Sequence, residues 1–267
     1  MQMVNFPGLG LSLNINRVAF EILGKEIYWY GIIIGTGLLL AVLLCVWEAK
    51  RVGLPEDTMV DIALVGTPTA IICARIYFVA WNWKDYAGNP LSAFAIWEGG
   101  IAIYGAIIGG VLAGYIYCRV KKISVPKVFD VGAFGLLIGQ IIGRWGNFVN
   151  VEAFGSETNL PWRMEIFNEE VSKIMTVHPT FLYESLWNLA GFLMLFAYRK
   201  YKKFEGEVFL LYVTWYGLGR MWIEQLRVDS LPYSGSFKIS QIVAVVTAIV
   251  GIMLICRNRK KEKSTVN

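Results

Sequence analysis

Apolar stretches long enough to cross a lipid bilayer recur along nearly the whole sequence. Crossing a hydrocarbon core of about 30 Å takes roughly 20 helical residues, and no polar segment of ordinary domain size separates these stretches. A mean hydropathy of +0.51 and a charged fraction of only 17% also lie far from the averages of soluble proteins. We therefore expect an all-α integral membrane protein, with residues 1–267 forming a single polytopic membrane domain.

Uninterrupted apolar length predicts seven transmembrane helices. They cover about 29–48, 60–81, 99–118, 128–143, 180–199, 207–226 and 238–256. Basic clusters follow the odd-numbered spans, such as Lys50 and Arg51 after the first span and 257–263 after the last. Because basic loops favour the cytoplasmic side, we expect the N-terminus outside and the C-terminus, with a basic tail at 257–267, in the cytoplasm.

Two segments are then expected on the extracytoplasmic side. The N-terminal arm, residues 1–28, runs into VAFEILGKEIYW, whose alternation across a Gly-Lys pair predicts a β-hairpin. Residues 146–179 form the longest connection, which is rich in turn residues and contains the helix-like stretch NEEVSKIM. This connection predicts a small extracytoplasmic cap.

The membrane itself explains several other features. The net charge of +5 does not require nucleic acid, because the basic residues gather beside the spans, where orientation in the bilayer explains them. The four cysteines stand singly in apolar runs, which is typical of small helix residues rather than metal ligands. Gly105 and Gly109, four residues apart in the third span, favour close helix packing. The expected partner is the lipid bilayer, and we expect neither a metal nor a cofactor.

Ionisable residues inside the spans are costly, so they indicate a polar interior or a functional site. By the expected topology they gather in the outer half, at Arg75, Glu98, Arg144, Glu184, Arg220, Glu224 and Arg227. The last three are spaced i, i+4, i+7, which places them on one helix face that cannot contact lipid. An internal ion pair would satisfy this stripe. The stripe and its neighbours, however, contain an excess of arginine, which binds phosphate through paired hydrogen bonds. This excess favours a site for a lipid phosphate.

The segment GRWGNFVNVEAFG, residues 143–155, directly follows the fourth apolar run. It carries Arg144, Asn147, Asn150 and Glu152 among glycines and aromatic residues. We expect it to be irregular, with the glycines letting the backbone turn and the asparagines supplying neutral hydrogen bonds. The segment would then bring Arg144 to the charged face of the sixth span.

Two further residues allow more than one interpretation. His178, the single histidine, stands at the outer start of the fifth span. A structural hydrogen-bonding role is favoured for it over catalysis. Tyr30, at the head of the first span, precedes Gly31; it can serve as an interfacial anchor or point into the bundle.

These motifs together resemble those of the bacterial prolipoprotein diacylglyceryl transferases. The long segment GRWGNFVNVEAFG is the most specific, and shorter ones support it in the family's order: YWYG at 28–31, EGG at 98–100, YG at 104–105, HPTFLYE at 178–184 and YGLGRMWIEQLR at 216–227. The resemblance covers nearly the whole chain. It implies seven spans with the N-terminus outside, in agreement with the topology expected from the basic loops.

The resemblance also implies an activity. The family moves the diacylglyceryl group of phosphatidylglycerol onto the thiol of the lipobox cysteine in a preprolipoprotein signal peptide, and releases glycerol phosphate. For this chain the resemblance implies a multi-pass protein of the bacterial cell membrane, with its active site on the extracytoplasmic side. By motif position it implies that Arg144 and Arg220 engage the lipid headgroup. The other residues that it marks are Tyr30, Asn147, Glu152, Gly155 and Glu224.

One position departs from part of the family. Some members carry a histidine, proposed as the catalytic base, where this chain has Tyr104. A histidine base at that position is therefore excluded here. Tyr104, Glu224, His178 and an oxygen of the phosphate all stay open as the group that takes the proton from the thiol.

The residues lead to a mechanistic hypothesis with two rivals. Arg144 and Arg220 would clamp the phosphate, Asn147 and Asn150 would orient the headgroup or the clamp, and Glu224 would hold Arg220. A transporter or channel for an anionic solute would also use an arginine-lined cavity, but the charges are one-sided and no internal repeat is present. A phospholipid hydrolase is the second rival, and no GxSxG or HExxH motif supports it.

Overall fold

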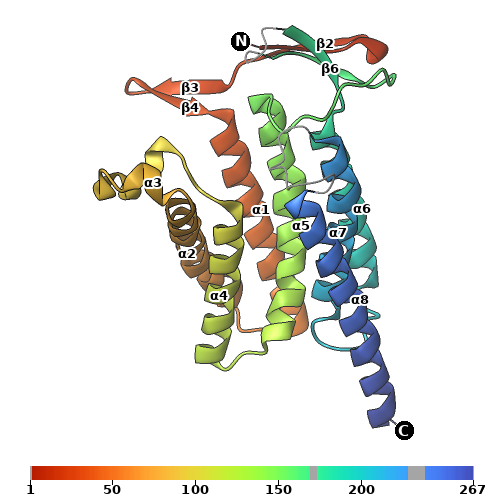
Figure 1. The fold of residues 1–267 in the computed structure, drawn as a ribbon. Coiled ribbons are helices and arrows are strands. Elements are labelled where there is room, and N and C mark those ends of the chain that lie inside the picture. Colours follow the sequence, from red (N-terminus) through yellow and green to blue (C-terminus); the bar gives the residue numbers. More distant parts are fainter. Residues whose placement is uncertain (1, 169–172, 228–237, 267) are drawn as a thin grey trace. The chain divides into compact units, whose positions relative to one another are not determined.

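The computed structural model describes residues 2–168, 173–227 and 238–266, and these are mostly helical (Figure 1). The long helices are α1 (Trp29–Val52), α2 (Thr58–Trp81), α4 (Ile103–Lys121), α5 (Val125–Asn150), α6 (Thr180–Tyr198), α7 (Glu207–Leu226) and α8 (Ile239–Val266). Within the described residues, six helices are long and apolar enough to span a membrane. The chain is thus an integral membrane protein. The remaining long helix, α7, falls short of that apolar measure, because it carries Glu207, Arg220 and Glu224.

The chain forms two compact units, Met1–Leu43 with Gly132–Asn267, and Leu44–Val131. In the second unit, α2 packs along α4. A Cβ atom added at Gly105 would lie 2.4 Å from the carbonyl oxygen of Cys73, and one at Gly109 would lie 2.6 Å from the Cβ of Cys73. Only glycine permits this approach, so the close packing predicted from their spacing is confirmed.

Short elements connect α2 to α4 in the second unit. They are α3 (Trp83–Tyr86) and two single-turn helices, η2 (Pro90–Phe94) and η3 (Ile96–Glu98). The helix α4 begins at Ile103, later than the expected position 99, because Gly99 and Gly100 adopt positive φ angles of 86° and 76°. Such angles are incompatible with a right-handed helix.

The described part of the first unit contains six strands. They are β1 (Gln2–Phe6), β2 (Leu11–Ile15), β3 (Val18–Ile22), β4 (Lys25–Tyr28), β5 (Met164–Asn168) and β6 (Lys173–Val177), with a single-turn helix η1 (Pro7–Leu9) after β1. An antiparallel sheet has the order β2-β1-β5-β6, so the N-terminal arm and the long connection after α5 share one sheet (Figure 1). Val4 and Ile166 from this sheet pack with Phe181 of α6 in one buried cluster.

The separate β3–β4 hairpin confirms the hairpin predicted from the sequence. Its turn lies at Leu23 and Gly24, both with positive φ, as expected for a tight two-residue hairpin loop. The helix predicted for NEEVSKIM is wrong at Asn168, which ends β5, and at 173–175, which belong to β6. Residues 169–172 lie outside the described part. Pairing between β5 and β6 overrides the local helical preference of the described residues.

Two tryptophans lock α6 against α7. The indoles of Trp187 and Trp215 stack with ring centroids 4.3 Å apart. Each indole N–H donates to the main-chain carbonyl of the other tryptophan, at 3.0 Å from Trp187 and 2.9 Å from Trp215. Gly191 and Gly219 leave the space in which these rings lie, since a Cβ at either would fall within 2.4 Å of an indole atom. The pair therefore fixes the register of the two helices.

We predict that Gly219→Ala weakens this helix pair. The new Cβ would lie 2.3 Å from Nε1 of Trp187, and overpacking of this kind costs about 1–3 kcal/mol. The midpoint of thermal unfolding, measured on purified protein in detergent micelles, should fall. Gly66→Ala is the matched control, because a Cβ there meets no atom within 4 Å. Equal midpoints for the two variants would show that the indole pair does not set the α6–α7 distance.

Candidate functional site

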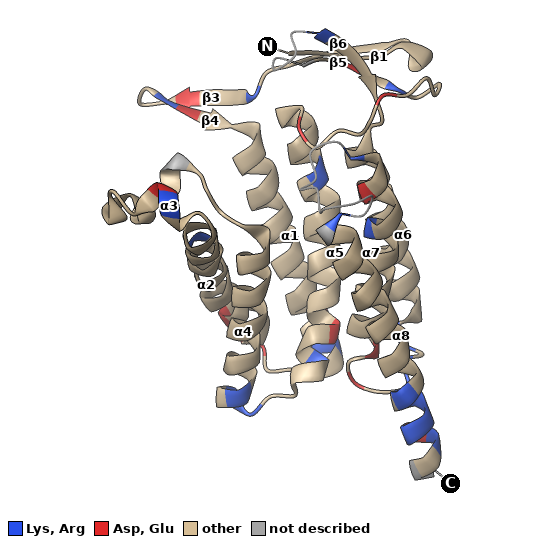
Figure 2. Ribbon diagram, in the orientation of Figure 1, with Lys and Arg blue, Asp and Glu red and all other residues tan. Residues whose placement is uncertain are grey.

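Three arginines converge on the buried carboxylate of Glu184. The guanidinium of Arg144 lies 2.5 Å from Glu184 Oε2, that of Arg220 lies 3.1 Å from Oε1, and that of Arg227 lies 3.6 Å from Oε1. The Glu184 side chain is 4% exposed. Figure 2 shows charged segments on α5, α6 and α7 towards the ends nearest the four-stranded sheet, and α5 and α7 carry others at their opposite ends. The structure thus joins four of the charged residues predicted from the sequence.

Glu224 provides a second buried carboxylate. It forms an ion pair with Arg220 one helical turn away, so the contact expected between these two residues is present. The hydroxyl of Ser240 donates to Glu224 Oε1 at 2.7 Å, and Lys238 Nζ donates to the Glu224 carbonyl at 2.8 Å. The start of α8 therefore holds the end of α7, where Arg220 and Arg227 lie.

A chain of hydrogen bonds leads from Arg144 along the end of α5. Arg144 Nη1 donates to Asn147 Oδ1 at 3.1 Å, and Asn147 Nδ2 donates to Glu152 Oε1 at 2.8 Å. Arg144, Asn147 and Glu152, which the sequence singled out separately, are thus one connected group.

The expectation of irregular structure from Arg144 onward is wrong, because helix α5 continues to Asn150. The glycines do not turn the chain there. A Cβ on Gly146 would lie 3.0 Å from the ring of Tyr30, so this glycine makes room for a side chain from α1. Tyr30 consequently points towards α5.

The helix α5 ends in a Schellman motif. The N–H of Val151 donates to the carbonyl of Phe148, and that of Glu152 donates to the carbonyl of Asn147, both at 3.0 Å. Val151 adopts a φ of 53°, a left-handed angle that glycine usually supplies at this position. A β-branched residue held in this conformation is strained, and the turn directs the chain so that Glu152 meets Asn147.

Gly155 and His178 tie the segment after α5 to the ends of α6 and α7. The N–H of Gly155 donates to the carbonyl of His178 at 3.0 Å, and that of Ser156 donates to the carbonyl of Leu226 at 2.6 Å. A Cβ on Gly155 would lie 2.7 Å from the Cβ of His178. This close approach explains why the site needs glycine here.

The imidazole of His178 contacts Tyr183, with 3.3 Å between Nδ1 and the hydroxyl oxygen. Burial lowers the pKa of His178 below its ordinary value, so the ring is neutral at neutral pH. These contacts agree with the structural role favoured from the sequence.

Arg75, Glu98 and Tyr104 belong to the other unit. The buried Arg75 guanidinium donates to four main-chain carbonyls of the α2–α4 connection, those of Ser92, Ala93, Gly99 and Gly100, at 2.6–2.9 Å. Arg75 therefore organises its own loop. The ring of Tyr104, in the first turn of α4, lies 6.5 Å from that of Tyr77, and the side chain of Glu98 lies outside the described part.

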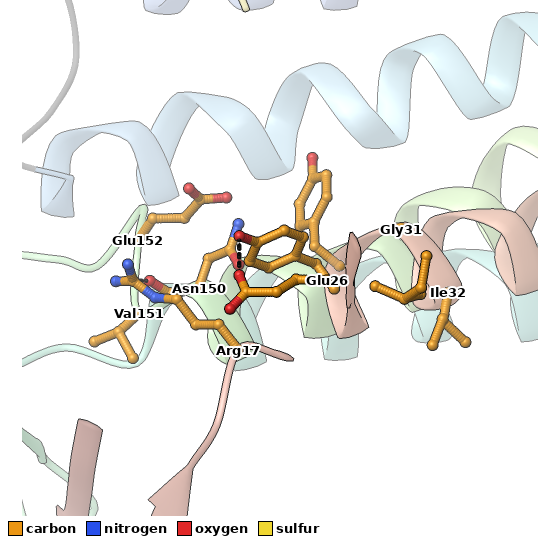
Figure 3. A pocket seen from close by; sticks show the side chains of 10 residues that line it. Arg17, Glu26, Gly31, Ile32, Asn150, Val151 and Glu152 are labelled. Carbon is orange, nitrogen blue, oxygen red and sulfur yellow. Dashed lines mark hydrogen bonds between the residues drawn. The ribbon is translucent and has the colours of Figure 1, made fainter. Parts of the chain in front are cut away.

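A pocket of about 840 Å³ lies beside the end of α5 (Figure 3). Its walls come from β4, the first turn of α1 and the residues that end α5, and they include Tyr30, Asn150 and Glu152. Sequence analysis missed Arg17, which lines this pocket and donates to the Asn150 carbonyl at 2.8 Å. It also missed Ser240. A cation at a helix C-terminus is favourable, but nothing in the sequence brings Arg17 to α5.

Comparison with known proteins gives consistent matches over nearly the full length. The family model described as prolipoprotein diacylglyceryl transferase matches residues 17–257. The phosphatidylglycerol–prolipoprotein diacylglyceryl transferase of Clostridioides difficile is 44% identical over 253 residues, covering 95% of this chain and 99% of that protein. Proteins of the same name from Bacillus cytotoxicus and Lysinibacillus sphaericus are 43% and 44% identical, over 94% and 95% of this chain and 95% and 96% of their own lengths.

We predict that Glu184→Gln strongly destabilises the first unit. Removing one partner of a buried ion pair costs about 3–5 kcal/mol, because the opposite charge is left uncompensated. The double variant Glu184→Gln with Arg227→Gln should recover part of this loss, since it removes one of the three cations. Thermal unfolding in detergent micelles, measured on the wild type, Glu184→Gln, Arg227→Gln and the double variant, completes the mutant cycle.

The matched control is Glu157→Gln, which removes an exposed carboxylate 3.9 Å from Lys173. Exposed pairs contribute at most about 1 kcal/mol, so its unfolding midpoint should stay near that of the wild type. A Glu184→Gln midpoint equal to that of the control would contradict a stabilising role for the shared carboxylate.

Proposed function

Because the chain belongs to the prolipoprotein diacylglyceryl transferase family, we propose that it transfers the diacylglyceryl group from phosphatidylglycerol to a prolipoprotein. The family match covers residues 17–257, and the relatives that carry this activity in their names align over nearly their whole lengths. The chain is accordingly a transferase that acts on a lipid and a protein within the membrane.

The acceptor is the thiol of a lipobox cysteine in the protein substrate. Its sulfur attacks the glycerol carbon that carries the phosphate oxygen. A carbon–sulfur bond forms, the carbon–oxygen bond breaks, and its electron pair leaves on the phosphate oxygen of glycerol phosphate. A thiol with a pKa of about 8.5 needs only modest help to lose its proton, so the main demand on the protein is to stabilise the departing phosphate.

Arg144 and Arg220 form the phosphate clamp. The observation that carries this proposal is their shared contact with Glu184, which holds two guanidinium groups from different helices side by side. Among the described residues, the three arginines of the cluster meet two buried carboxylates, Glu184 and Glu224. This excess of guanidinium groups over carboxylates within the cluster suits a phosphodiester anion.

The clamp acts most strongly as the bond breaks. The departing phosphate gains negative charge, so fixed guanidinium groups stabilise the transition state more than the bound lipid. Asn147 orients Arg144 through the hydrogen bond between them, and Glu224 orients Arg220. The candidates for the base are Tyr104, Glu224, His178 and a phosphate oxygen. A tyrosine hydroxyl has a reference pKa near 10, so this pKa would have to be much lower for Tyr104 to act as the base.

The cluster lies on the extracytoplasmic side of a bacterial cell membrane. We place the N-terminus outside and count α7, the sixth long helix along the chain, as a further span that brings the total to seven, with its acidic groups paired to Arg220 and Arg259. Residues 1–28 and 146–179 then form the outer cap, and pairing of β1 with β5 supports their common position. The basic end of α8 supports a cytoplasmic tail at 257–267 (Figure 2). One membrane domain over 1–267 stays a prediction.

We predict thiol-dependent transfer by the purified protein. Full-length protein in detergent micelles is incubated with phosphatidylglycerol labelled in its acyl chains and a synthetic lipobox peptide. Labelled peptide and free glycerol phosphate should form together, and a peptide with serine in place of cysteine should stay unlabelled. Lipid hydrolysis without peptide would identify a hydrolase. Flux of an anionic solute into vesicles that contain the reconstituted protein, in the absence of transfer, would identify a transporter.

We also predict that Arg144→Lys lowers kcat/KM for transfer by at least about tenfold, since lysine keeps the charge but loses the paired donors. Arg119→Lys, at the exposed basic end of α4, is the matched control and should retain activity. Initial rates with the labelled lipid measure both variants. Full activity in Arg144→Lys would exclude the clamp.

A further inference from the structure

We propose that the pocket beside the end of α5 binds the acceptor protein, as an extended segment around its cysteine. The pocket holds about 840 Å³, and the inference rests on the proposed transfer to a prolipoprotein. A two-substrate transferase must hold the acceptor next to the lipid. The arginine cluster accounts for the phosphate alone, so the acceptor requires a second surface that adjoins it.

The pocket and the arginine cluster share a wall. Asn150 and Glu152 line the pocket, and Figure 3 shows both on the same side of it as Arg17. Glu152 is joined to Arg144 through Asn147 by hydrogen bonds of 2.8 Å and 3.1 Å. A cysteine held against Glu152 is therefore close to a phosphate held by Arg144. This proximity is what attack on the phosphate-bearing carbon requires.

The strand β4 borders the pocket with its edge. Its consecutive residues Glu26, Ile27 and Tyr28 all line the pocket, although successive side chains of a strand point to opposite faces. The main chain between them must therefore face the pocket. In the described part of the chain, β4 pairs with β3 in a two-stranded sheet and leaves its other edge without a strand. An extended peptide can add to such an edge through main-chain hydrogen bonds.

The charged residues that line the pocket favour the acceptor peptide over the lipid as its ligand. Two carboxylates, Glu26 and Glu152, line it with one cation, Arg17. Arg17 already donates to the Asn150 carbonyl at 2.8 Å and to Gln2 Oε1 at 3.1 Å. The lining therefore carries one net negative charge, which repels a phosphate but accepts a neutral peptide main chain. Phosphatidylglycerol fits the arginine cluster better than it fits this pocket.

Gly31 gives the wall a recess that can be filled. It lies in the first turn of α1, it lines the pocket, and a Cβ there meets no atom within 4 Å. A larger side chain at this position would project into the pocket without colliding with the fold. Gly31→Leu is therefore a steric block aimed at the acceptor, and Gly31→Ala is a milder version of it.

Steady-state kinetics on the full-length protein test the proposal, with the lipobox peptide and phosphatidylglycerol varied in turn. Gly31→Leu should raise the KM for peptide by at least about tenfold and leave the KM for lipid within about twofold, because it blocks one substrate alone. Gly31→Ala should have a smaller effect in the same direction. Gly66→Leu, in α2 and also facing open space, should change neither KM. Unfolding midpoints near that of the wild type would show that each variant is folded.

The other outcomes overturn the proposal. A raised KM for phosphatidylglycerol with an unchanged KM for peptide would make the pocket a lipid subsite. Unchanged constants for both substrates in folded Gly31→Leu would mean that the acceptor binds elsewhere.

Photo-crosslinking tests binding in the pocket independently of the transfer activity, because it requires no catalytic turnover. A lipobox peptide with a diazirine residue beside its cysteine should crosslink to 26–32 or 150–152, and Gly31→Leu should reduce the yield. Crosslinks confined to other segments would overturn the pocket as the acceptor site. Crosslinking in the pocket by a wild-type protein that shows no transfer would contradict the activity and leave the binding site standing.

Discussion

The buried carboxylate of Glu184 holds the ends of three helices together. Arg144 comes from α5, Arg220 from α7 and Arg227 from the residue after α7, while Glu184 itself belongs to α6. A charge removed from water is tolerable only with partners in good geometry. The Trp187–Trp215 pair sets the register of α6 on α7, and the strained end of α5 brings Glu152 to Asn147. The charged cluster therefore depends on packing that lies outside it.

The arginines inside this chain have different surroundings, and these suit them to different roles. Arg75 is bound by four carbonyls of its own loop, which occupy four of its five N–H donors and fix the connection between α2 and α4. Arg144 and Arg220 instead share one carboxylate, which orients their guanidinium groups while leaving positive charge in excess. A cluster oriented before an anion arrives needs little reorganisation during reaction. The partners of each arginine, rather than burial alone, distinguish the loop organiser Arg75 from the proposed phosphate clamp.

The sequence predicted the elements whose signals are local. Apolar length located the helices, and alternation across a turn located the β3–β4 hairpin. Glycine spacing also identified the close approach of α4 to α2. The errors arose where a distant segment decides the local structure. Gly146 suggested a turn, but it makes room for the Tyr30 ring within a continuous helix. The end of NEEVSKIM has a helical pattern, yet it forms β6 because β5 lies beside it.

The sequence by itself determined that this chain is a helical membrane protein, and it predicted which residues carry its chemistry. Hydrophobic length and residue type are properties of short segments, so both can be read without the fold. Only the tertiary structure decided that Arg144, Arg220 and Arg227 meet at Glu184 and that Arg75 is bound by carbonyls of the α2–α4 connection. It also brought the N-terminal arm to the end of α5, through Arg17 and the pocket that both segments line. Ion pairs and pockets arise between segments far apart in sequence, where packing alone fixes the distances.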